Sequence, residues 1–156
     1  MVILGIDPGT TRVGYGVIKK SGPTISYIDA GLLDIPKAAP KTTKLVILDR
    51  EINDLLDRFS PARVGIERIF FSKNQKTALD VAEARGVIMT SIVKKSIPML
   101  EFTPSSVKAA LTGDGRASKT GVAKIVSYIL KRDVGLIDDV TDALAIAIVT
   151  SNEPWN

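Results

Sequence analysis

The sequence predicts a single α/β domain, residues 1–156, built on one mixed five-stranded sheet with helices on both faces. Two observations predict it. Three strand-like segments come first, and two short apolar strands then alternate with helical segments. With 156 residues, 45% of them hydrophobic, the chain can bury one core and is too apolar to be disordered.

The three opening strands are expected at residues 2–6, 13–18 and 25–33. Residues 7–9 and 21–23, which contain glycine and proline, form the turns between them. Because short turns join antiparallel neighbours, these segments predict three consecutive antiparallel strands.

Helices and strands alternate in the middle of the chain. Apolar residues recur at three- and four-residue spacing from Leu45 to Phe59, and again from about residue 77 to residue 95. This spacing is typical of amphipathic helices. Short strands are expected at residues 64–66 and 99–102, one after each helix.

Three helices complete the chain. Thr103 followed by Pro104 has the form of an N-cap and a proline at the first helical position, and this helix should end near Gly113. Two more helices are expected at residues 118–131 and 138–150. RNase H-like folds use this order of strands and helices, so we expect that fold.

Composition restricts the chemistry. The chain has no cysteine and no histidine, which excludes disulfides, thiolate metal sites and imidazole bases. Carboxylates are therefore the only strong metal ligands. No apolar run reaches the roughly 18–20 residues that span a bilayer, and residues 1–7 lack the basic region of a signal peptide. We expect a cytoplasmic protein without a membrane segment.

The positive charge is concentrated in one part of the sequence. The net charge is +4, and residues 94–132 contain eight basic residues against two acidic ones. A polyanion such as DNA could be attracted to one side of the molecule while another side holds the acids. A solvated helical surface is the alternative interpretation.

Four acidic residues occupy positions where their side chains are expected to converge. Asp7 follows the first strand and Glu67 the fourth, so both lie at the same sheet edge if those strands are parallel neighbours. Asp139 and Asp142 are three residues apart at the start of the last helix, on one face of its first turn.

Such a cluster is costly unless a cation neutralises it, and oxygen ligands favour Mg²⁺, with Mn²⁺ as a substitute. Two ions roughly 4 Å apart can activate a water and stabilise the leaving oxygen in phosphodiester hydrolysis. The interpretation is that Asp7 bridges the ions, Glu67 and Asp142 complete the two coordination shells, and Asp139 ligates an ion or orients the attacking water.

Each acid also has a structural interpretation. Asp7 could form the turn before Pro8, Asp138 could be the N-cap of the last helix, and Asp139 and Asp142 could favour its dipole. The catalytic interpretation depends on their joint placement.

Five ordered segments resemble the RuvC-type Holliday-junction resolvases of bacteria. They are GIDPGTTRVGYGVI from Gly5, GIERIFFSKN from Gly65, ALDVAEARG from Ala78, FTPSSVKAALTGDGRASKTGV from Phe102 and DDVTDALAIAI from Asp138. The resemblance implies a homodimeric endonuclease in recombination and repair that makes paired symmetrical nicks at a four-way DNA junction. It also implies a junction-binding and branch-migrating motor complex as partner.

The resemblance places the catalytic acids on the same four residues, Asp7, Glu67, Asp139 and Asp142. Some family members have histidine where Asp139 stands, and the adjacent Asp138 leaves open which of the two faces the metals.

DNA contacts implied by the same resemblance fall on one aromatic and four basic residues. Phe70 resembles a wedge that stacks on an unpaired base, and phosphate contacts are expected from Lys73, Lys108, Arg116 and Lys119.

The helix around residues 82–92 carries more apolar and small residues than one buried face requires. Ala84, Gly86, Val87 and Met89 lie beyond one stripe, which suggests a second apolar surface and a dimer contact.

Three other functions are alternatives to a resolvase. An RNase H-like nuclease that processes ribosomal RNA would carry similar acids, so only a comparison of substrates separates it from a resolvase. The glycine-containing turn after the first strand also resembles the phosphate-binding turn of sugar kinases and actin-like ATPases, but those proteins need two lobes. A non-catalytic junction-binding scaffold would not need the intact acidic set.

Overall fold

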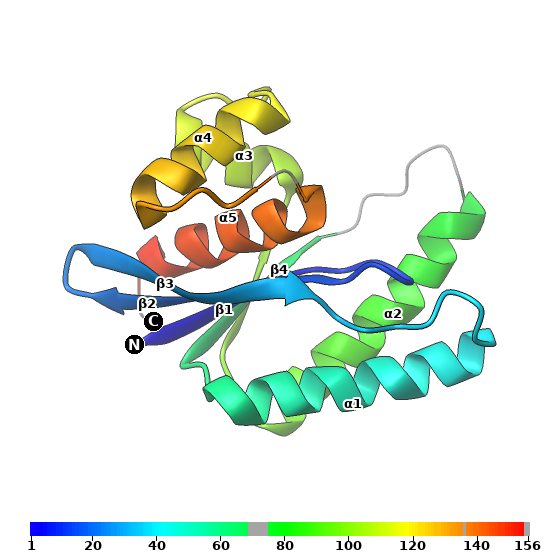
Figure 1. The fold of residues 1–156 in the computed structure, drawn as a ribbon. Helices are drawn as coiled ribbons and strands as arrows, with labels where there is room; N and C mark the ends of the chain where they lie inside the picture. Colours follow the sequence, from blue (N-terminus) through cyan, green and yellow to red (C-terminus); the bar gives the residue numbers. More distant parts are fainter. Residues whose placement is uncertain (69–74, 136, 155–156) are drawn as a thin grey trace.

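The computed structural model describes residues 1–68, 75–135 and 137–154. It contains one five-stranded sheet with the strand order β3-β2-β1-β4-β5 (Figure 1). The strands are β1 (Val2–Asp7), β2 (Gly14–Ser21), β3 (Thr24–Leu32), β4 (Arg63–Glu67) and β5 (Met99–Phe102). The helices are α1 (Lys41–Phe59), α2 (Gln75–Lys94), α3 (Pro104–Thr112), α4 (Lys119–Leu130) and α5 (Asp138–Asn152).

Strand directions are as the sequence predicted. β1 pairs antiparallel with β2, and β2 with β3, whereas β4 pairs parallel with both β1 and β5. This is the mixed sheet of an RNase H-like fold. Asp7 and Glu67 are the last residues of β1 and β4, so the two parallel strands carry both acids to one edge of the sheet.

The two faces of the sheet have separate cores. α1 and α2 cover one face, and α5, with α3 and α4 outside it, covers the other (Figure 1). Alternate residues of β1 divide between them, because Leu4 packs toward α1 and α2 whereas Ile3 packs with α5. No helix within the described ranges is long and apolar enough to cross a membrane.

Two helix starts differ from the sequence expectation. α1 begins at Lys41, directly after Pro40, because proline suits a helix start and the apolar stripe marks only the later turns. Asp138 is the first residue of α5 and not its N-cap, since Ile137 occupies the cap position. By contrast, Thr103 caps α3 as predicted, and its hydroxyl accepts a hydrogen bond from the Ser106 N–H at 3.0 Å.

The basic stretch does not form one face. Lys94 and Lys95 lie at the end of α2, on the face opposite α3 and α4. Lys95 pairs there with Asp57 of α1 at 2.5 Å. Within this stretch, the positive charge beside the acids comes from Lys108 and Lys119.

Glycines allow α5 to lie directly on the sheet. A Cβ atom at Gly5 would stand 2.0 Å from the carbonyl oxygen of Ala143, and one at Gly65 would stand 2.0 Å from the Thr150 hydroxyl oxygen. No side chain fits at these separations, so the helix backbone rests on the bare strands.

We expect Gly5→Ala to lower the free energy of unfolding by about 3 kcal/mol, because the added methyl group must push α5 away from β1. Gly86→Ala is the matched control, since the space beside Gly86 is open and alanine favours helix by roughly 1 kcal/mol. Urea unfolding measures both variants. Equal stabilities would contradict the close packing of α5.

Candidate active site

Three carboxylates from three elements lie near the end of the parallel strands. Asp7 and Glu67 leave neighbouring parallel strands, and each carboxylate influences the pKa of the other. Asp142, one turn into α5, lines a cleft of about 250 Å³ together with Glu67. The structure therefore places these three side chains at the same end of the sheet.

Burial and mutual repulsion perturb these acids. Burial, followed by the charges of Glu67, Asp142 and Asp139 in that order of effect, raises the pKa of Asp7 to about 8. Burial and the charge of Asp142 raise the pKa of Glu67 to about 7. The pKa of Asp142 is also raised, chiefly by burial. Without a bound cation, the folded protein concentrates carboxylates that resist ionisation.

Asp138 and Asp139 face different cations. The Asp138 carboxylate accepts a hydrogen bond from Lys119 Nζ at 2.9 Å and is exposed. Asp139 pairs with Arg12, which the sequence interpretation had not identified. Both residues act on the acid cluster. Asp139 adds to the raised pKa of Asp7, and after burial the charges of Asp138 and Asp139 both raise the pKa of Asp142.

The donor chemistry fits a hard divalent cation. The cluster offers only carboxylate oxygens, and a cation would favour the ionised forms that burial disfavours. In the described part of the chain, no three acidic side chains are yet close enough to surround one ion.

Two of the predicted basic residues lie beside the acids. Lys108 of α3 and Lys119 of α4 line the same cleft, and their charges lower the pKa of Glu67 against the effect of its burial. Arg116 is exposed in the loop between α3 and α4 and does not line this cleft. Phe70 and Lys73 lie outside the described residues.

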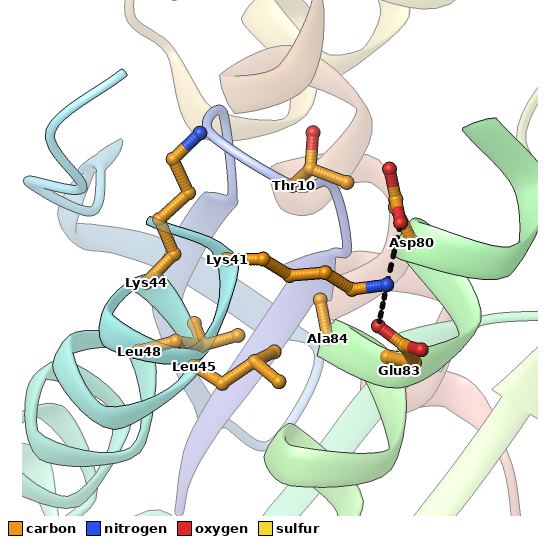
Figure 2. A pocket seen from close by; sticks show the side chains of 8 residues that line it. All are labelled: Thr10, Lys41, Lys44, Leu45, Leu48, Asp80, Glu83 and Ala84. Carbon is orange, nitrogen blue, oxygen red and sulfur yellow. Dashed lines mark ion pairs between the residues drawn. The ribbon is translucent and has the colours of Figure 1, made fainter. Parts of the chain in front are cut away.

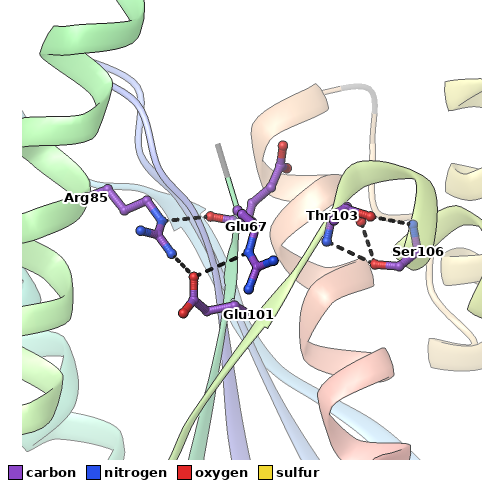
Figure 3. A network of polar contacts seen from close by, with 6 residues as sticks. Glu67, Arg85, Glu101, Thr103 and Ser106 are labelled. Atoms are coloured by element: carbon purple, nitrogen blue, oxygen red, sulfur yellow. Dashed lines mark hydrogen bonds and ion pairs between the residues drawn. The ribbon is translucent and has the colours of Figure 1, made fainter. Parts of the chain in front are cut away.

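Arg85 supports the backbone of Glu67, a role that the sequence did not predict. Its side chain is only 17% exposed, and Nε donates a hydrogen bond of 3.1 Å to the Glu67 carbonyl oxygen (Figure 3). The same guanidinium pairs with Glu101 of β5, which Arg68 also approaches at 3.8 Å. One arginine from α2 thus ties together the ends of β4 and β5. The only sequence signal is a lone cation within an apolar stretch of helix.

A second pocket lies between α1 and α2, away from the acid cluster. It has a volume of about 140 Å³ and is lined in part by Thr10 and Lys44 (Figure 2). Lys41 crosses it to pair with Asp80 at 2.9 Å and Glu83 at 2.6 Å. These ion pairs join the two helices, so the pocket belongs to the contact between α1 and α2.

The stripe on α2 differs from the one expected. Ala84 is buried in the core and belongs to the first face. The exposed apolar residues are Leu79 and Val93 of α2, 57% and 62% exposed, and the nearby Val46 of α1, 71% exposed. With the exposed Gly86 they form a second surface, which we call the α2 stripe.

Comparisons with known proteins agree on one family. Residues 3–150 match the protein-family model described as crossover junction endodeoxyribonuclease RuvC. The RuvC of Petrotoga mobilis is 40% identical over 153 residues, which cover 97% of this chain and 94% of that protein. The RuvC of Thermotoga maritima is 42% identical over 146 residues, which cover 93% and 87%.

Solved structures show the same likeness. Thermus thermophilus RuvC in complex with a Holliday junction substrate superposes with a TM-score of 0.89 at 30% identity, covering 97% of this chain and 93% of that one. The separate structure of Thermus thermophilus RuvC gives a TM-score of 0.86 over the same shares of the two chains.

The raised pKa of Asp7 predicts a pH-dependent stability in the presence of a chelator. Between its ordinary value of 3.8 and about 8, Asp7 is ionised in the unfolded chain but protonated in the folded one, so rising pH favours unfolding. Asp7→Asn removes this effect. The stability of the variant relative to the unsubstituted protein should grow over this window, by on the order of 3 kcal/mol.

Urea unfolding in EDTA from about pH 5 to about pH 9 measures the difference. Asp54→Asn, at an exposed position of α1, is the matched control and should show no such trend. A constant difference between Asp7→Asn and the unsubstituted protein would show that Asp7 titrates normally.

Proposed function

The chain belongs to the RuvC family of crossover junction endodeoxyribonucleases, and on this premise we propose that it resolves four-way DNA junctions through Asp7, Glu67, Asp139 and Asp142. The observation that carries the proposal is the convergence of buried carboxylates at the ends of β1 and β4, with two lysines in the same cleft. A relative 30% identical to this chain has been solved with a Holliday junction substrate.

The acids would hold Mg²⁺, and Mn²⁺ in its place, with two ions for each site. Divalent ions there would supply charge stabilisation and activation of a water for phosphodiester hydrolysis. Asp7 ends the strand next to the one that carries Glu67 and would bridge the ions, while Glu67 and Asp142 would complete the two coordination shells. Asp139, at the edge of the cluster, would complete the set or orient the attacking water.

The remaining residues of the cleft act on the DNA. Lys108 and Lys119 reach the cleft from α3 and α4, so a phosphate that enters between them is held beside the carboxylates. Arg116 and the neighbouring exposed surface would contact phosphates farther along the strand. Arg85 keeps the end of β4 in place, which holds Glu67 toward the cleft while the substrate binds.

We propose a homodimer that pairs two such sites. The α2 stripe is the surface that supports it, because its apolar side chains are solvent-exposed in one chain. Two sites related by a two-fold axis would place one cut in each of two like strands. A cytoplasmic location and a partner motor complex that moves the junction are part of the same proposal.

The first test is cleavage of a labelled four-way DNA junction, a linear duplex and an RNA–DNA hybrid, with Mg²⁺ or with EDTA. We expect paired nicks in the junction alone, and loss of at least about a thousandfold in rate for Asp7→Asn. Junction affinity in EDTA should stay within about threefold, since the lysines are intact.

Asp54→Asn, the same change on α1, should cut at the original rate. Cleavage of the hybrid alone would transfer the function to RNA processing. Cleavage by Asp7→Asn at the original rate would remove Asp7 from the site.

The dimer is tested by a charge placed on the α2 stripe. Val93→Glu should weaken self-association at least about tenfold in sedimentation, because a buried unpaired carboxylate is costly at an apolar contact. Tyr128→Glu is the control, since Tyr128 is 84% exposed on α4, on the other face of the sheet. Equal weakening by both variants would place the contact elsewhere.

A further inference from the structure

Arg12 holds one of the four acids at the edge of the candidate active site. It lies in the loop between β1 and β2, and its guanidinium contacts Asp139 Oδ2 twice, from Nε at 2.7 Å and from Nη2 at 2.6 Å. The two residues are 127 positions apart in the sequence. The pair therefore joins the loop that follows Asp7 to the first turn of α5.

The backbone on both sides of this pair is fixed by close contacts. A Cβ atom at Gly9 would stand 2.2 Å from the Arg12 carbonyl oxygen, so the loop folds back tightly on itself. A Cβ atom at Gly14 would stand 2.0 Å from the Asp139 carbonyl oxygen, so α5 begins against the start of β2. These contacts bring the two side chains together wherever the sheet is formed.

The side chains themselves remain accessible. The Arg12 side chain is 54% exposed and that of Asp139 is 28% exposed. Pairs this open to water are weak, and their partners exchange readily. The backbone keeps Arg12 beside Asp139, but the contact between their side chains is weak. A cation that binds Asp139 more strongly can therefore displace the Arg12 guanidinium from it.

We propose that Arg12 is a positioning residue that competes with a divalent cation for Asp139 and thereby sets how tightly the acid cluster binds that cation. The inference rests on the proposed function, because it takes the acid cluster as the cation site. When the cation binds, Asp139 turns from the guanidinium toward the cluster, and the free energy of breaking the pair reduces the affinity. Arg12 is released to solvent in the same event.

The test measures binding of Mn²⁺ alone, by paramagnetic resonance of the free ion, to the full chain without DNA. Arg12→Gln should tighten Mn²⁺ binding by about threefold to tenfold, because Asp139 no longer has to leave a partner. In an Asp139→Asn background, the same Arg12→Gln substitution should change the affinity less than about twofold.

This cycle separates competition from long-range charge. If Arg12 acted only as a nearby positive charge, its removal would tighten Mn²⁺ binding equally in both backgrounds, and the inference would fail. Unchanged or weaker binding by Arg12→Gln would also overturn it, while leaving the proposed cation site intact. If Asp7→Asn binds Mn²⁺ as well as the unsubstituted protein, the proposed function fails with it.

A second measurement follows the guanidinium directly. In a Mg²⁺ titration, the Nε–H resonance of Arg12 should move to the position of a free arginine. Arg63, which is buried and donates to the carbonyl oxygens of Glu153 and Pro154, provides the reference that should not move. An Arg12 signal that stays in place at saturating Mg²⁺ would contradict the release.

Discussion

The direct contact of α5 with the sheet is the constraint on which the site depends. Side chains normally separate a helix from the sheet it covers, but the absence of Cβ atoms at Gly5 and Gly65 lets this helix rest on the strands themselves. Its first turn is thereby carried to the strand ends, where Asp142 joins Asp7 and Glu67. A helix held farther out would leave the strand carboxylates without a partner from α5.

The cluster concentrates negative charge that the rest of the molecule only partly offsets. Lys108 and Lys119 counter it within the cleft, and Arg12 counters it at the edge. The pKa of Asp7 nevertheless remains near 8, which shows that burial outweighs the nearby cations. A cluster of this kind lowers folding stability at neutral pH, because its acids resist ionisation in the folded protein but ionise in the unfolded chain.

Sequence reasoning found what depends on local pattern. Alternation and helical spacing gave the elements, and because strands end where their apolar runs end, Asp7 and Glu67 could be placed at one edge. The partner of Asp139 could not be found, since Arg12 lies 127 residues away and only the folded loop brings it near. The start of α1 at Lys41 was missed because that turn is solvent-exposed and carries no apolar signal. The net charge of residues 94–132 also predicted one basic side wrongly, because Lys94 and Lys95 lie on the opposite face of the sheet from α3 and α4.

Arg85 gives the molecule a mechanical link that the sheet alone does not provide. It belongs to α2, the helix that carries the α2 stripe, and its side chain donates a hydrogen bond to the carbonyl oxygen of Glu67 at the end of β4. Any displacement of α2 would therefore be transmitted through Arg85 to the end of the strand that carries Glu67. Arg85 therefore couples the position of the helix that carries the α2 stripe to the position of Glu67.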